Sequence, residues 1–353
     1  MTGGIRSLKV KSLLTVLAAC ALCLTGCARS DAKDAYTKGC EALESGAVEE
    51  SRTYFEGVLE TGYFLSHAYR GIGLGYMMEG DYADACIAFE KSLLELQEES
   101  EEFQRDVSLY LAFCRDLQGQ PEKTMEIYNQ LIRRSPDPEV LFLRGRLNLR
   151  NGEAKAAKRD FDQAVSMSSD YDLYINIYHI YDEMDRSGDG SGYLEQALAE
   201  ASRHEEEYYE QGLVNYYLQN YDEAKDFLIK AIRKNADDKN AIFLLGQVYL
   251  SLGDVANARA VYNDYTGTEG MAGGACNGLA LCDIAENDYE SALAHVQAGL
   301  AEDPGNQGLL YNEIVICEQM RDWNGARTKA AAYVARFPTD EAGLREYEFL
   351  STR

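Results

Sequence analysis

The sequence contains few histidines and lacks the residue patterns on which most enzymes depend. Of its 353 residues, four are histidine, five are proline and one is tryptophan. No HExxH zinc motif, GxSxG nucleophile elbow or Walker-type phosphate loop occurs, and the histidines lie far apart, at His67, His179, His204 and His295. We therefore expect no catalytic site, no cofactor and no metal ion.

Positive charge is also scarce. The chain has 34 lysines and arginines against 59 aspartates and glutamates, and its formal net charge is −25. Such a surface repels phosphate backbones, so we expect no nucleic-acid partner. One local basic cluster predicts either a receptor for an acidic segment or a solvated helix face, and it consists of Arg133, Arg134, Arg144, Arg146 and Arg150.

Long apolar runs are missing except near the N-terminus. Residues 13–24 form an uncharged segment that follows Arg6, Lys9 and Lys11. A membrane-spanning helix needs about 20 apolar residues. This run has about a dozen, which is the size of a signal-peptide core. The alternatives are an uncleaved anchor helix or an ordinary secretory leader.

The apolar segment ends in Leu24-Thr25-Gly26-Cys27, which resembles the lipobox of bacterial lipoproteins. The resemblance implies cleavage before Cys27 and attachment of a lipid to its thiol. We predict a signal peptide at 1–26, then a lipidated cysteine and short tether at 27–33. An extended six-residue tether would reach roughly 20 Å. The protein would be held on the extracytoplasmic face of a bacterial membrane by its lipid.

Six further cysteines show neither CxxC spacing nor a nearby histidine at zinc-finger spacing. All fall in predicted helices, which favours small buried thiols. A single disulfide is the alternative, because an extracytoplasmic site permits one. The six are Cys40, Cys86, Cys114, Cys276, Cys282 and Cys317.

The C-terminal half repeats a pattern every 34 residues. A small or apolar marker is followed twelve residues later by alanine, and four residues after that by a larger or apolar side chain. The markers are Gly212, Gly246, Ala280 and Ile314; the alanines are Ala224, Ala258, Ala292 and Ala326; the last positions are Leu228, Tyr262, Val296 and Ala330.

The N-terminal half repeats the same order less evenly, with spacings of 34, 39 and 33 residues. The longer spacing coincides with an acidic run at 98–102. The markers are Gly39, Gly73, Ala112 and Gly145; they are followed by Ser51, Ala85, Thr124 and Ala157, and then by Phe55, Phe89, Tyr128 and Phe161.

This period and residue order resemble the tetratricopeptide repeat, a pair of antiparallel helices. One such pair cannot bury its apolar face alone, so neighbouring pairs must stack. The resemblance implies an all-α, right-handed superhelical solenoid of about nine helical hairpins. We expect four units at 34–170, a degenerate unit with a Gly/Ser/Asp loop at 171–204, four regular units at 205–338, and a capping helix at 339–353.

The loop of the degenerate unit has a weak similarity to a calcium-binding loop. Asp185, Ser187 and Asp189 have suitable spacing, but Gln196 replaces the bidentate glutamate that supplies much of the ligand charge. We therefore expect a flexible turn rather than a calcium site.

The resemblance also implies that the first helix of each pair lines a concave face that binds extended peptides or partner helices. The positions expected there rarely carry the basic and amide residues of a carboxylate clamp, Arg70 and Asn277 being exceptions. We predict a largely aromatic partner groove, the alternative being that these aromatics only pack between units. The predicted groove residues are Tyr36, Phe142, Tyr209, Leu213, Tyr216, Phe243, Gln247, Leu250 and Tyr311.

These features predict a membrane-anchored scaffold that binds an unidentified protein or peptide and catalyses no reaction. The alternative is a structural component of an envelope assembly or secretion complex. Neither the scaffold nor the structural component identifies a partner, because a fold does not determine a function.

Overall fold

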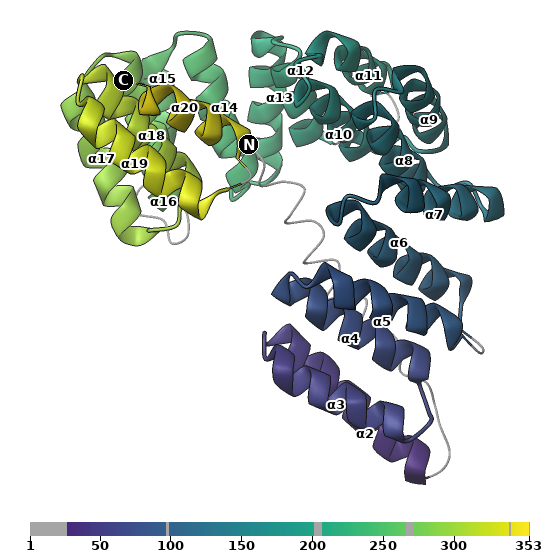
Figure 1. Ribbon diagram of the computed structural model, residues 1–353. Helices are drawn as coiled ribbons and strands as arrows, with labels where there is room; N and C mark the ends of the chain where they lie inside the picture. The colour runs from purple at the N-terminus through teal and green to yellow at the C-terminus, as the bar shows by residue number, and fades with distance from the viewer. Residues whose placement is uncertain (1–26, 97–98, 201–206, 266–271, 339, 353) are drawn as a thin grey trace. The chain divides into compact units, whose positions relative to one another are not determined.

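A computed structural model describes residues 27–96, 99–200, 207–265, 272–338 and 340–352, and Figure 1 shows its ribbon. All regular elements in these ranges are α-helices, which confirms the predicted class. The signal peptide predicted at 1–26 lies outside the described residues. Within the described ranges, no helix combines the length and apolar character needed to cross a bilayer.

The chain divides after Ser168 into two compact units. Unit 1 consists of four antiparallel helix pairs, and neighbouring pairs pack against each other in sequence order. Its helices are α2 (Cys27–Glu44), α3 (Val48–Glu60), α4 (Leu65–Glu79), α5 (Tyr82–Leu94), α6 (Glu101–Leu117), α7 (Pro121–Arg134), α8 (Pro138–Arg150) and α9 (Ala154–Met167).

Unit 2 consists of five helix pairs followed by a single helix, so the described chain forms the nine hairpins that the repeat predicts. Its helices are α10 (Tyr171–Asp182), α11 (Ser187–Ala199), α12 (Tyr208–Tyr217), α13 (Tyr221–Lys234), α14 (Lys239–Ser251), α15 (Val255–Asn263), α16 (Ala272–Ala285), α17 (Tyr289–Glu302), α18 (Gln307–Gln319), α19 (Trp323–Arg336) and α20 (Glu341–Ser351).

The repeated small markers bring the two helices of a hairpin into close contact. A Cβ atom built on Gly73 would lie 2.5 Å from the ring of Phe89. One built on Gly246 would lie 2.3 Å from the ring of Tyr262. Since real Cβ atoms do not approach so closely, only glycine allows the large side chain to fill the seam. The same relationship joins Gly39 to Phe55, Gly145 to Phe161 and Gly212 to Leu228.

Each hairpin reverses direction at a residue with positive φ, between 54° and 81°. A left-handed residue just after a helix lets the chain satisfy the last free carbonyl groups of that helix. Glycine occupies this position in five hairpins, at Gly46, Gly80, Gly119, Gly152 and Gly253. The other four use larger residues: Asp185, Gln219, Asn287 and Arg321.

The predicted extended tether is wrong for the described chain. Helix α2 begins at Cys27, so residues 28–33 are helical. A helix rises only 1.5 Å per residue, and this segment is therefore much shorter than an extended strand of the same length. Ala32 is already fully buried, which explains why the helix continues into this segment.

The predicted Gly/Ser/Asp loop is also wrong. Helix α11 begins at Ser187, and the glycines that follow belong to the helix. Arg186 and Asp189 form an ion pair of 2.7 Å across its first turn. Gly190 is buried, and its missing side chain lets α11 approach α10.

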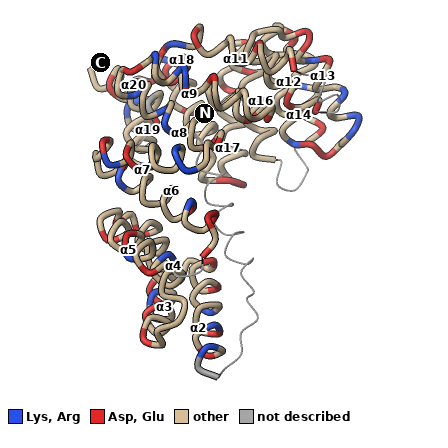
Figure 2. Tube along the Cα trace, turned by 90° about the vertical axis from the view of Figure 1, so that its right-hand side faces the viewer, with Lys and Arg blue, Asp and Glu red and all other residues tan. Residues whose placement is uncertain are grey.

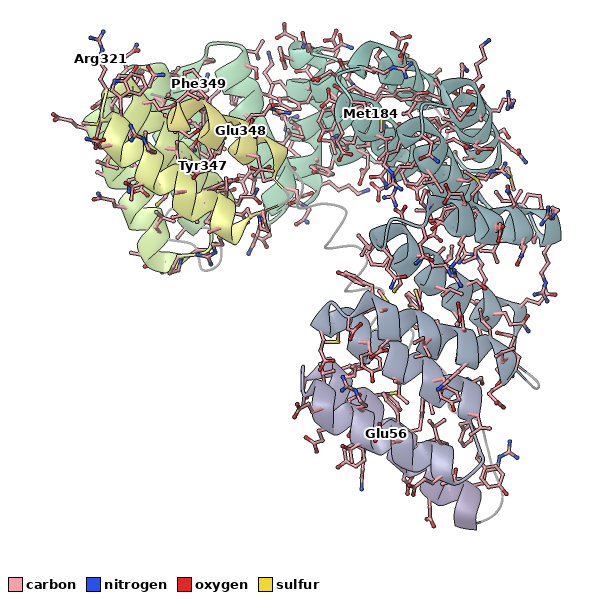
Figure 3. All side chains as sticks on the ribbon, viewed as in Figure 1. Glu56, Met184, Arg321, Tyr347, Glu348 and Phe349 are labelled. Carbon is pink, nitrogen blue, oxygen red and sulfur yellow. The ribbon has the colours of Figure 1, made fainter. Side chains whose placement is uncertain are left out.

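Helix α20 covers the last hairpin. Leu350 and Tyr347 pack against the buried group that contains Ala330 and Tyr333. The Tyr333 hydroxyl donates a hydrogen bond of 2.7 Å to the buried carboxylate of Asp340, which precedes the helix. The other side of α20 remains exposed, and Figure 3 shows its C-terminal side chains.

Candidate protein-interaction surface

The first helices of the hairpins lie closer together than the second helices. In unit 2, α12 contacts α14, α14 contacts α16 and α16 contacts α18; in unit 1, α2 contacts α4. No two successive second helices among the described residues are in comparable contact. In a curved stack the more closely spaced elements lie on the inner side. We refer to the first helices of a unit as its first-helix layer.

In unit 1, the two predicted groove residues support the hairpin seam. The ring of Tyr36 lies 5.6 Å from that of Phe55 and 6.0 Å from that of His67. The ring of Phe142 lies 6.0 Å from that of Phe161. Burial raises the pKa of Tyr36, and nearby Arg70 opposes the rise. Both residues are half-buried.

In unit 2, two predicted groove residues pack against large seam side chains. Phe243 stacks on Tyr262 at 6.3 Å between ring centroids, and Tyr311 meets Tyr333 edge-on at 5.6 Å. Leu250 packs on the same group as Phe243. These side chains are again only half-buried.

Helix α12 carries the densest part of the predicted groove. Tyr209, Leu213 and Tyr216 pack against the buried group around Ala224 and Leu228. All three side chains are half-buried, as is Gln247 on α14. All nine predicted residues are thus half-buried, and all except Gln247 pack against buried side chains of their own unit. Their role in binding stays a prediction.

The structure adds three aromatic residues that sequence reasoning missed. Tyr178 and His179 of α10 lie 5.4 Å and 4.8 Å from the ring of Tyr217 on α12. Burial raises the pKa of Tyr217 to about 12 and lowers the pKa of His179. A sequence signal existed, because Tyr178 stands 34 residues before the marker Gly212.

Most of the basic cluster is already paired within unit 1. Arg144 donates two hydrogen bonds to Asp160, at 3.0 and 2.6 Å, and one to Asn129. Arg150 pairs with Asp116. Arg134 pairs with Glu101. A receptor for an acidic segment is therefore not supported there.

The two exceptional polar residues do not form a carboxylate clamp. Asn277 accepts a hydrogen bond of 2.8 Å from Asn312, so it takes part in packing between α16 and α18. Arg70 is only 4 % exposed, and its guanidinium lies over the ring of Phe103 at 4.9 Å. The two side chains belong to different units.

A cavity of about 640 Å³ lies in unit 1 between α6, α7 and the start of α8. Its two arginines are engaged by carboxylates of the same unit. Arg105 donates to Asp137 at 3.0 Å and to Glu139 at 2.6 Å. Arg134 donates to Glu101 at 3.0 Å. The cavity therefore offers no free cation to a ligand.

Metal-ligating side chains do not cluster among the described residues. No group of three histidines, cysteines or carboxylates is placed to hold a metal ion within the described ranges. His295 contacts Asp283 at 2.6 Å, but that carboxylate also pairs with Arg259 at 2.7 Å, as in a packing contact. The six cysteines beyond Cys27 are free and buried, as the sequence predicts.

Stacked helical hairpins with small-to-large seams define an α-helical solenoid. Residues 106–138, 138–171 and 209–272 each match the tetratricopeptide repeat family. These segments therefore carry tetratricopeptide repeats, as the 34-residue period predicts. The architecture of the chain is that of a protein-interaction scaffold, because such arrays present extended binding surfaces.

Two solved structures are similar to this chain at low sequence identity. Yeast Tom70 has a TM-score of 0.52 and 13 % identity, over 99 % of this chain and 86 % of Tom70. A tetratricopeptide repeat protein from Parabacteroides merdae has a TM-score of 0.46 and 15 % identity, over 83 % of this chain and 98 % of that protein. No curated protein shows a significant sequence match.

Proposed function

We propose that this protein is a lipid-anchored adaptor that binds a segment of another protein on the first-helix layer of unit 2. The observation that carries the proposal is the row of half-buried aromatic side chains on consecutive first helices, centred on Tyr209, Tyr216 and Phe243. Aromatic residues with one packed side and one accessible side offer a large contact area that is already ordered. Binding then costs little conformational entropy.

A crosslinking pull-down at the membrane surface tests the binding site. The variant Tyr209→Ala/Phe243→Ala is compared with the wild type, and we expect a discrete partner that the variant loses. The matched control is Phe227→Ala/Tyr289→Ala, which removes two half-buried aromatics from the second helices α13 and α17. A partner retained by the first variant, with unchanged helix content, would contradict the assignment.

The membrane anchor is proposed from the lipobox at residues 24–27. Two or more acyl chains anchor a protein stably, whereas one holds it only marginally. Labelling with radioactive palmitate should therefore mark the wild type and not Cys27→Ala. The variant should also leave the membrane fraction. Equal labelling of both proteins would contradict lipidation at Cys27.

A further inference from the structure

In unit 2, acidic residues outnumber basic ones on the first helices but not on the second helices. Its first helices carry six carboxylates, on Asp172, Asp182, Glu210, Asp283, Glu313 and Glu318, and a single base, Lys239. Its second helices carry eight lysines and arginines against seven carboxylates. In unit 1 the first helices are nearly balanced, with nine bases and ten acids. Basic and acidic residues both occur throughout the described chain (Figure 2). The large excess of carboxylates on the first helices is found in unit 2 and not in unit 1.

Three carboxylates of this layer gather near Tyr209, at the N-terminal ends of neighbouring first helices. Asp172 and Glu210 lie in the first turns of α10 and α12, and Asp238 caps α14. Burial, followed by the charges of Asp238, Glu210 and Asp172, raises the pKa of Tyr209 to about 12. All three carboxylates therefore act on the same aromatic side chain.

Burial and neighbouring carboxylates disfavour the ionised forms of Glu210 and Asp172. Burial raises the pKa of Glu210, and Glu207, Asp172 and Asp238 raise it further. Burial also raises the pKa of Asp172, and Asp170 and Glu207 add to the rise. Both shifts mean that the ionised forms are less stable here than in water.

Among the described residues, Asp172 and Glu210 have no partner of the kind that neutralises comparable carboxylates in the same unit. Asp283 pairs with Arg259 at 2.7 Å, and Glu313 pairs with Lys329 at 2.6 Å. Among the described residues, no lysine or arginine lies within ion-pair distance of Asp172 or Glu210. A cation from outside the chain would relieve the repulsion that these two carboxylates experience.

We propose that the partner segment is basic: its lysine or arginine side chains bind against Asp172 and Glu210, and its apolar side chains contact Tyr209, Tyr216 and Phe243. This inference rests on the proposed function, since it names the chemistry of the segment bound on the same layer. Complementary charge gives specificity and a faster association. Ammonium and guanidinium groups also bind favourably over aromatic faces. The competing explanation is that the carboxylates only stabilise their helix N-termini.

Fluorescence anisotropy with the full-length chain in detergent tests the proposal. The probe is a fluorescein-labelled peptide built from a lysine–leucine–serine repeat, and a second peptide carries glutamate in place of every lysine. We expect the lysine peptide to bind, and Asp172→Asn/Glu210→Gln to bind it about fivefold more weakly. The salt dependence of binding should also become smaller in this variant.

The matched control is Glu223→Gln/Glu290→Gln, which removes two exposed first-turn carboxylates from the second helices α13 and α17. It has the same change in charge and should bind like the wild type. Equal binding of the glutamate peptide, or wild-type affinity in Asp172→Asn/Glu210→Gln, would overturn the inference. Loss of the cellular partner in Tyr209→Ala/Phe243→Ala but not in Asp172→Asn/Glu210→Gln would overturn it while leaving the adaptor function intact.

Discussion

Gly190 of α11 lies directly against the backbone of Tyr178 in α10. A Cβ atom built on Gly190 would lie 3.1 Å from the Cα atom of Tyr178 and 3.0 Å from the Cβ atom of Tyr181. In the regular hairpins a small or apolar marker on the first helix is followed twelve residues later by alanine, serine or threonine. Here the marker position holds the large Tyr178, and the residue twelve positions later is glycine in exchange for alanine. The close approach of the two helices is thereby kept.

This exchange predicts opposite effects for two neighbouring glycines. Gly190→Ala should lower the free energy of unfolding by about 1–3 kcal/mol, because the added methyl meets backbone that cannot move aside. Gly192→Ala should raise it by about 0.5–1 kcal/mol, because alanine favours the helix and nothing lies within 4 Å of that position. Urea unfolding measures both changes. Equal effects would show that Gly190 is not in the helix seam.

The turn before α19 predicts a stabilising substitution. Arg321 has a φ of 61° and points away from the helices (Figure 3). An L-residue in this conformation costs roughly 1–2 kcal/mol, and glycine loses somewhat more chain entropy on folding. Arg321→Gly should therefore gain about 0.5–1 kcal/mol.

The control for that substitution is Arg327→Gly, at an exposed position inside α19. Glycine there should cost about 1 kcal/mol, since the backbone is helical. The two variants remove the same side chain, so urea midpoints that move in the same direction would argue against a left-handed turn at Arg321.

One phenol adds hydrogen bonds to the apolar contact between α20 and the last hairpin. Tyr333 donates to Asp340 at 2.7 Å and accepts from Gln307 at 2.9 Å. Tyr333→Phe leaves the buried carboxylate without this donor and should cost about 1–3 kcal/mol. Tyr311→Phe is the control, because the neighbouring Tyr311 keeps its ring contact and makes no hydrogen bond through its hydroxyl among the described residues. Hydrogen exchange of α20 should increase only in Tyr333→Phe.

Acid should destabilise unit 1 through His67. Burial lowers the pKa of this histidine from its usual 6.5 to about 4, with Arg70 adding to the effect and Glu99 opposing it. The unfolded chain therefore binds a proton between these two pH values, and stability is lost as the pH falls from 6.5 towards 4. Between pH 7 and pH 5, the loss through this group is about 2 kcal/mol.

The variant His67→Gln tests this prediction because it removes the titrating group. Other groups still titrate, so the quantity to compare is the difference between wild type and variant at each pH. The wild type should lose about 2 kcal/mol more than the variant between pH 7 and pH 5. Parallel pH profiles of unfolding would contradict a buried, neutral His67.

The sequence by itself determined the repeating part of this protein. The 34-residue spacing, the small markers and the seam residues such as Phe89 and Tyr262 together determine the hairpins, because each hairpin is closed by contacts within a short stretch of chain. Glycine follows the first helix at five of the turns, where a left-handed residue ends the helix. The lipobox at Cys27 is likewise a local pattern, and its consequence stays a prediction.

Only the tertiary structure decided how residues in different hairpins meet. It showed that the predicted groove aromatics are half-buried against seam side chains, that α11 continues through the expected loop, and that Asp172, Glu210 and Asp238 gather around Tyr209. These relationships depend on how neighbouring hairpins stack, which is set by side-chain volumes across residues far apart in the sequence. A sequence period gives the number of residues between repeats. It does not determine how one side chain is oriented towards another.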